Sequence, residues 1–177
     1  MTTVKSTSKI LLQVLLFSLF IFSSEAVMAQ RPLATFKTTI KSSAGTLLDS
    51  VKVTVIDNTA IVAEGVTARD GKFKFASFYN KSLIVEFEKP GYLKQTIKVS
   101  TYISPRIIPE DMSMTLTVEM LPVPATNPTA HFDKATEEII LDTTQGKFIF
   151  NPEYKAKIKD EWEAFRKSLS EGTQASN

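Results

Sequence analysis

The chain has 177 residues, of which 43% are hydrophobic and 23% are charged, and it has a formal net charge of +2 and no cysteine. This composition is typical of one globular domain, or of one domain with an appendage. A near-neutral charge argues against nucleic acid as a partner, because nucleic-acid-binding proteins usually carry a concentrated basic stripe. The lack of cysteine excludes disulfides, thiolate metal sites and a lipid anchor on an N-terminal cysteine, so this is not a lipoprotein.

Residues 1–29 have the parts of a secretory signal peptide. Lys5 and Lys9 form a basic start, and residues 10–22 form an apolar run of 13 residues. Such a run is short for a bilayer span, which needs about 20 residues. We therefore expect cleavage before Gln30 and export to the periplasm, the outer membrane or the medium, with no transmembrane anchor after cleavage. An uncleaved N-terminal anchor is the alternative.

Runs of alternating apolar and polar residues predict seven short strands between residues 34 and 120. The expected strands are residues 34–40, 47–56, 61–68, 72–78, 83–88, 92–100 and 112–120. Seven short strands at this spacing predict an all-β sandwich. On the apolar side of these runs, the alternation places five core residues, namely Val53, Phe75, Val85, Val99 and Leu116.

Two motifs stand at the centre of this pattern. Residues 66–75 read VTARDGKFKF, in which Asp70-Gly71 predicts a β-hairpin, and residues 83–92 read LIVEFEKPGY. The chain from residue 34 to 122 resembles the carboxypeptidase regulatory-like domain, in which a T-x-D-G-x-F-x-F hairpin precedes a strand that ends K-P-G-Y. The resemblance implies a seven-stranded antiparallel prealbumin-like (transthyretin-like) β-sandwich that carries no active site of its own.

A proline-rich segment separates this region from the C-terminal part. Three prolines within residues 121–128 favour an extended spacer, so we expect a sandwich at 30–122, a linker at 123–130 and a C-terminal unit at 131–177. In that unit, two short β runs at 138–142 and 147–150 predict a second β-hairpin.

A helix is expected over about 152–170. Asn151 is a suitable N-cap, and Pro152 suits the first helical position. Helical spacing then gives one apolar stripe, made of Tyr154, Ile158, Trp162, Phe165 and Leu169. The stripe packs either on the chain's own hairpin or on a partner. A sandwich followed by a hairpin and a final helix resembles a group of exported proteins of Gram-negative bacteria.

No pattern of catalytic, cofactor-binding or metal-ligating residues is found. His131 is the one histidine and has no nucleophile motif beside it. Glu86 and Glu88 alternate with core residues and are expected on a solvated face rather than in a carboxylate pair. The candidates for contact with a partner or ligand are therefore aromatic residues, namely Phe78, Tyr79, Tyr92, Trp162 and Phe165.

The sequence thus predicts a non-catalytic binding or assembly module of the bacterial cell envelope that acts through protein–protein contacts. The expected partner is an envelope protein, with an outer-membrane protein as one option. A carbohydrate- or peptide-binding protein that uses exposed aromatics is the alternative, and a hydrolase with an unrecognised site is the least favoured. No cofactor is expected.

Overall fold

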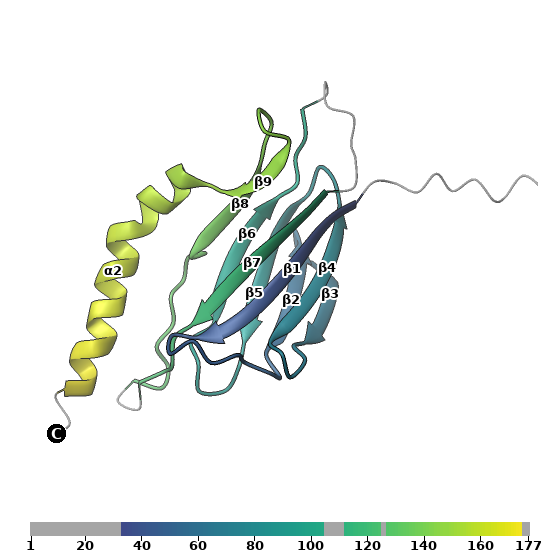
Figure 1. Ribbon diagram of the computed structural model, residues 1–177. Helices are drawn as coiled ribbons and strands as arrows, with labels where there is room; N and C mark the ends of the chain where they lie inside the picture. Colours follow the sequence, from purple (N-terminus) through teal and green to yellow (C-terminus); the bar gives the residue numbers. More distant parts are fainter. Residues whose placement is uncertain (1–32, 105–111, 125–126, 175–177) are drawn as a thin grey trace, which may run out of the picture. The chain divides into compact units, whose positions relative to one another are not determined.

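The computed structural model describes residues 33–104, 112–124 and 127–174 (Figure 1). The expected signal peptide and its cleavage site lie outside the described residues. The described part holds nine strands and one helix: β1 (Leu33–Ser42), β2 (Lys52–Asp57), β3 (Ala60–Val66), β4 (Lys72–Phe78), β5 (Ser82–Glu88), β6 (Gln95–Ser100), β7 (Met112–Met120), β8 (Glu137–Asp142), β9 (Lys147–Phe150) and α2 (Pro152–Gln174). Within it, no helix is long and apolar enough to cross a membrane.

The strands form two sheets, one of three strands in the order β4-β1-β7 and one of six in the order β3-β2-β5-β6-β8-β9. The fold is therefore mainly β, as the alternation predicts. The purely antiparallel arrangement expected from the resemblance is wrong, because β7 pairs with β1 in parallel and β8 pairs with β6 in parallel. Local sequence sets the face of each strand but does not choose its partner.

The core lies between the two sheets and confirms the predicted register. All five predicted core residues are buried, with Val53 fully enclosed and Leu116 only 5% exposed. The Phe36 and Phe75 rings stack across β1 and β4 at a centroid distance of 5.0 Å. Inward-facing aliphatic and aromatic residues of both sheets thus bury the apolar surface that drives folding.

The C-terminal hairpin is part of this sandwich and does not form a unit of its own. β8 and β9 complete the six-stranded sheet, and Ile139, Leu141 and Phe148 belong to the same buried cluster as the other strands. The Phe148 ring lies 5.0 Å from the ring of Phe36, centroid to centroid. This corrects the expected separation of residues 131–177 behind a linker, because the chain after the prolines returns to the edge of β6.

The turn at Asp70-Gly71 is present, but it does not join a hairpin. Gly71 has a φ of 67°, and its N–H donates to the carbonyl oxygen of Ala68 at 2.9 Å. The strands on either side belong to different sheets, since β3 pairs with β2 and β4 pairs with β1. The Gly71 carbonyl oxygen accepts from the Ile40 N–H at 2.8 Å, which holds the turn against β1. The turn therefore connects the two sheets.

The second predicted strand also begins later than expected. The chain turns before β2, where Ser50 has a φ of 51°. The Thr67 hydroxyl accepts from the Val51 N–H at 3.0 Å and donates to the Leu48 carbonyl oxygen at 2.8 Å. These bonds replace ladder bonds, so Leu48 and Val51 pack inward from a loop, whereas Leu47 is exposed.

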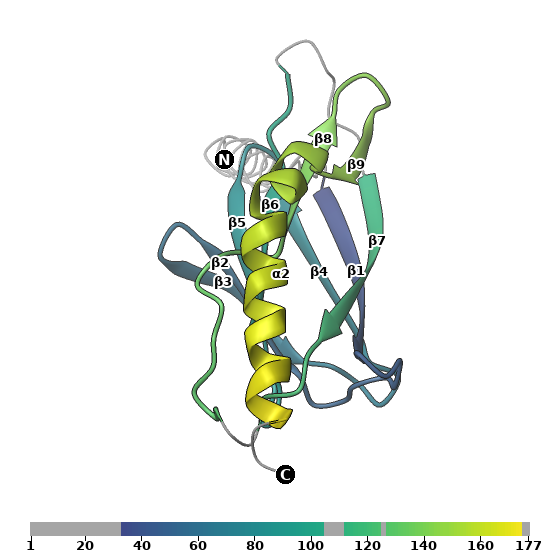
Figure 2. The same cartoon turned by 90° about the vertical axis from the view of Figure 1, so that its left-hand side faces the viewer.

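The helix begins as the capping residues predict. The Asn151 side-chain oxygen accepts from the N–H groups of Glu153 and Tyr154, at 3.1 and 3.3 Å. Ile158 is buried, whereas Trp162 and Phe165 are half-buried. Figure 2 shows β7 on one side of α2 and β5 on the other. The helix thus packs on its own chain, most closely at Ile158 in the middle of the stripe.

Candidate functional site

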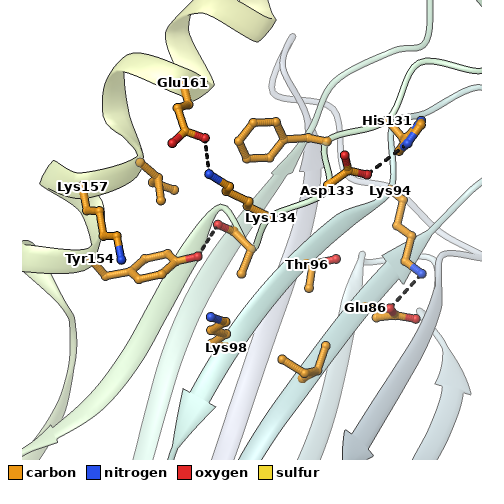
Figure 3. Close-up of a pocket in the computed structure, with 14 residues that line it drawn as sticks. Glu86, Lys94, Thr96, Lys98, His131, Asp133, Lys134, Tyr154, Lys157 and Glu161 are labelled. Atoms are coloured by element: carbon orange, nitrogen blue, oxygen red, sulfur yellow. Dashed lines mark hydrogen bonds and ion pairs between the residues drawn. The ribbon is translucent and has the colours of Figure 1, made fainter.

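The helix α2 borders two clefts, one on each flank. The first, here called the polar cleft, has a volume of about 640 Å³ and lies between α2 and the outer face of β5 and β6 (Figure 3). Its charged and polar lining comes mainly from Glu86, Lys94, Lys98, Lys134, Tyr154 and Glu161. The second, here called the β7 groove, has a volume of about 730 Å³ and lies between α2, the end of β7 and the start of β8. Its lining includes Gln95, Thr117, Glu119, Glu137, Phe150 and Trp162.

Most charges of the polar cleft are already paired. Lys94 Nζ lies 2.8 Å from Glu86 Oε1 and 3.0 Å from Glu88 Oε1. Burial would lower the pKa of Lys94, but the hydrogen bonds and charges of the two glutamates outweigh it and raise the pKa above its usual value. Lys134 Nζ lies 2.5 Å from Glu161 Oε2, which ties α2 to the chain before β8. Both lysines are therefore already paired with glutamates of the same chain.

Tyr154 lines the polar cleft where α2 begins. Its hydroxyl donates to the carbonyl oxygen of Ala135 at 2.9 Å. Burial raises the pKa of Tyr154, and the negative charge of Glu138 raises it further. The ammonium of Lys98 sits 5.3 Å from the centroid of the Tyr154 ring, within the range of a cation–π contact. The residue is therefore a neutral hydrogen-bond donor that anchors the helix.

His131 lies at the rim of this cleft, and its surroundings do not suit a general base. Its Nε2 lies 3.0 Å from Asp133 Oδ1, and its Nδ1 lies 3.1 Å from the carbonyl oxygen of Thr129. Both ring nitrogens thus face acceptors, so neither is placed to take a proton from a nucleophile. The His131 and Asp133 side chains are 71% and 84% exposed, so water screens the pair.

An aromatic cluster fixes the far half of the helix. Phe132 lies 4.9 Å from the Trp162 ring and 5.3 Å from the Phe165 ring, centroid to centroid. The Trp162 and Phe165 rings are 5.7 Å apart. Phe132 follows the proline-rich segment and was not among the sequence candidates, because no periodic pattern surrounds it. The cluster holds Trp162 at the lining of the β7 groove.

The β7 groove leaves part of the inner face of the sandwich uncovered. Phe150 follows Phe148 on the same face of β9, yet Phe148 is 6% exposed and Phe150 is 39% exposed. The groove has an apolar floor that includes Ile97, Val118 and Ile158, with lysine, arginine and glutamate side chains of α2 along its rim. An open apolar floor with a charged rim is suited to binding rather than to proton transfer.

The aromatic residues singled out from the sequence do not lie in one place. Trp162 lines the β7 groove, and Phe165 contacts it from the next turn of α2. Phe78 is 50% exposed at the end of β4, and Tyr92 is half-buried beside the core. Tyr79 is 9% exposed and belongs to the buried cluster, so its expected exposure is wrong. The turn after β4 folds that ring inward.

Other residues of the β7 groove could not be predicted from the sequence. Gln95 and Glu137 carry no motif, and only the pairing of β6 with β8 brings them to one cleft. Among the described residues, no group of three or more His, Cys, Asp or Glu side chains lies close enough together to hold a metal ion. The expectation that the chain uses no metal stays a prediction.

Comparisons with known proteins give distant structural similarities. No protein-family model and no curated protein matches the sequence. The TIE protein of Bacillus anthracis is similar with a TM-score of 0.43 and 17% identity, over 52% of this chain and 18% of that one. Wild-type catechol 1,2-dioxygenase of Acinetobacter radioresistens has a TM-score of 0.45 and 9% identity, over 63% of this chain and 59% of that one.

A third similarity is to the dioxygenase domain of a dioxygenase carbohydrate-binding protein fusion from Streptomyces sp. SirexAA-E. Its TM-score is 0.38 at 15% identity, over 52% of this chain and 83% of that domain. This chain therefore spans only part of the first two proteins and most of the third. Scores and identities of this size carry no inference about the activity of this chain.

Proposed function

We propose that the chain is a non-catalytic binding or assembly module of the bacterial cell envelope and that it acts through protein–protein contacts. The observation that carries this proposal is the β7 groove, where the 39%-exposed Phe150 and the half-buried Trp162 leave apolar surface open above a buried apolar floor. Uncovered apolar surface rimmed by polar residues marks a site of interaction. The partner is an envelope protein, with an outer-membrane protein as the first candidate.

The envelope location rests on the sequence. Residues 1–29 have the composition of a secretory signal peptide, and an exported chain without cysteine must be held together by its core alone. The buried cluster that joins both sheets is consistent with this requirement. The proposal of a non-catalytic role is supported by the paired lysines of the polar cleft and by the acceptors on both nitrogens of His131.

Site-specific photo-cross-linking in the native cell tests this proposal. A photoreactive phenylalanine analogue replaces Trp162 in the β7 groove, and a matched control carries the analogue in place of the exposed Lys74 on β4, at the far edge of the three-stranded sheet from β7. We expect one protein adduct of defined mass from position 162 and none from position 74. Equal adducts from both positions would place the contact elsewhere. Retention of the full chain on envelope glycan, with no protein adduct at either position, would favour the carbohydrate-binding alternative.

A further inference from the structure

The strand β7 has a free edge that opens into the β7 groove. Among the described strands it pairs with β1 alone. The carbonyl oxygen of Met120 accepts from the Ser43 N–H at 3.1 Å, so the even-numbered residues of β7 direct their backbone groups toward β1. Because these groups alternate along a strand, Thr117 and Glu119 direct their N–H and C=O groups away from β1. Both residues line the groove, and no partner for these groups is found in the part of the chain that the structure describes.

On the opposite side of the groove, one buried side-chain atom also lacks a hydrogen-bond partner. It belongs to Glu137, which lines the groove beside the 3%-exposed Gln95. Glu137 Oε2 is buried without a hydrogen-bond partner in the described chain, although Glu137 Oε1 lies 3.6 Å from Lys155 Nζ. Buried polar atoms are normally satisfied, so this carboxylate oxygen, together with the free backbone groups of Thr117 and Glu119, indicates that an occupant supplies the missing bonds.

The charged residues of the groove indicate which end of an occupant is basic and which is acidic. Glu137 Oε2 needs a donor, and Lys155 already faces the other oxygen of that carboxylate. Farther along α2, Lys159 Nζ lies 4.0 Å from Glu163 Oε1, whereas Arg166 has no carboxylate partner among the described residues. An occupant that is complementary in charge therefore carries a hydrogen-bond donor or a basic side chain at the Glu137 end and an acidic side chain at the Arg166 end.

The length of the groove fits a short extended segment. Its wall on α2 runs from Pro152 to Arg166, which is about 21 Å along the helix axis. An extended chain covers that length with about six residues. Alternate side chains of such a segment would lie on the apolar floor between Phe150 and Trp162, while its backbone faces the free groups of Thr117 and Glu119.

We infer that the β7 groove binds an extended polypeptide segment of the partner, which pairs with the free edge of β7 as an added strand. The segment has apolar residues at alternate positions, a donor or basic residue facing Glu137 and an acidic residue facing Arg166. Strand addition supplies the affinity through main-chain hydrogen bonds, and the floor of the groove supplies the specificity. This inference rests on the proposed function and names the partner chemistry of the same site.

Peptide selection on the folded full chain tests the inference. The probe is a phage-displayed library of random dodecapeptides, and binding of the selected peptides is measured by titration calorimetry. The variant Thr117→Pro removes an N–H that points into the groove, and proline is tolerated at such an edge. The matched control Thr117→Val keeps the N–H and replaces the hydroxyl with a methyl group. Circular dichroism confirms that each variant is folded.

We expect Thr117→Pro to weaken peptide binding by about tenfold or more, the usual effect of leaving hydrogen-bonding groups unpaired, and Thr117→Val to bind like the parent chain. Amide hydrogen exchange should slow at Thr117 and Glu119 when peptide is bound. Arg166→Glu should shift the selected peptides from acidic to basic residues at one end.

Unchanged binding by Thr117→Pro, or no slowing of exchange along β7, would overturn strand addition. If no peptide is selected while position 162 still cross-links to a protein, the inference fails and the proposed function stands. If neither peptide nor protein is captured, both fail.

Discussion

Replacement of Phe148 by alanine tests whether the C-terminal hairpin completes the core. Phe148 is 6% exposed, and its ring centroid lies 5.0 Å from that of Phe36, which is fully buried. Removing a buried phenylalanine side chain costs about 3–5 kcal/mol through lost transfer free energy and the cavity left behind. A domain of this kind is stable by about 5–15 kcal/mol, so the variant should lose a large part of its free energy of unfolding.

Equilibrium unfolding in urea, followed by circular dichroism, measures the change. Phe78→Ala is the matched control, because it removes the same side chain at a position that is 50% exposed. We expect the control to lose about 1 kcal/mol or less, since exposed positions contribute little. Equal losses for Phe148→Ala and Phe78→Ala would refute the placement of β9 in the core.

A chain that ends at Val123 extends the same test. It lacks Ile139, Leu141 and Phe148, all of which belong to the buried cluster. We expect it to lose cooperative unfolding. A separate sandwich, as the proline-rich segment suggests from sequence, would leave this truncated chain folded and soluble.

Three further predictions concern other parts of the chain. Leu116→Ala, at a site that is 5% exposed, should lower the free energy of unfolding by about 2–5 kcal/mol in the urea assay, and a loss below about 0.5 kcal/mol would show that the register of β7 is wrong. N-terminal sequencing of the exported form should begin at Gln30, and a start at Met1 with retention in the membrane would contradict cleavage. Hydrogen bonds from the Thr144 hydroxyl, at 2.6 Å, and from its N–H, at 2.8 Å, hold the pKa of Asp142 below its ordinary 3.8. The charged Asp142 carboxylate therefore stabilises the fold above pH 3.8, and this contribution is lost as the pH falls through the lower pKa of Asp142 in the folded state. The difference in free energy of unfolding between wild type and Asp142→Asn should therefore shrink below pH 3.8. A difference that stays constant would contradict this prediction.

Much of the strand pattern could be predicted because alternation is local. The buried positions of β2, β5 and β7 follow directly from the side-chain period of two, as at Val53, Val85 and Leu116. The capping residue Asn151 likewise marks the start of α2 from its own chemistry. These features depend only on neighbours in the sequence.

The partners of the strands could not be predicted in this way. Nothing near Asp70-Gly71 indicates that β3 and β4 enter different sheets, and nothing near Ile139 indicates that β8 pairs with β6 in parallel. Phe150 has the same alternation as Phe148, yet it borders the open groove because no element covers it. The β7 groove is formed by these strand pairings, which depend on tertiary contacts. For this reason, Trp162 is the one sequence-predicted contact residue that lines it.

The most direct test of the account is amide hydrogen exchange of the full chain, alone and saturated with the purified protein that cross-links at position 162. We expect slower exchange at Thr117 and Glu119 of β7, which line the β7 groove with free backbone groups. Exchange along β3 and β4, at the opposite ends of the two sheets, should not change. Protection gained on β3 or β4, with none on β7, would contradict the β7 groove as the binding site.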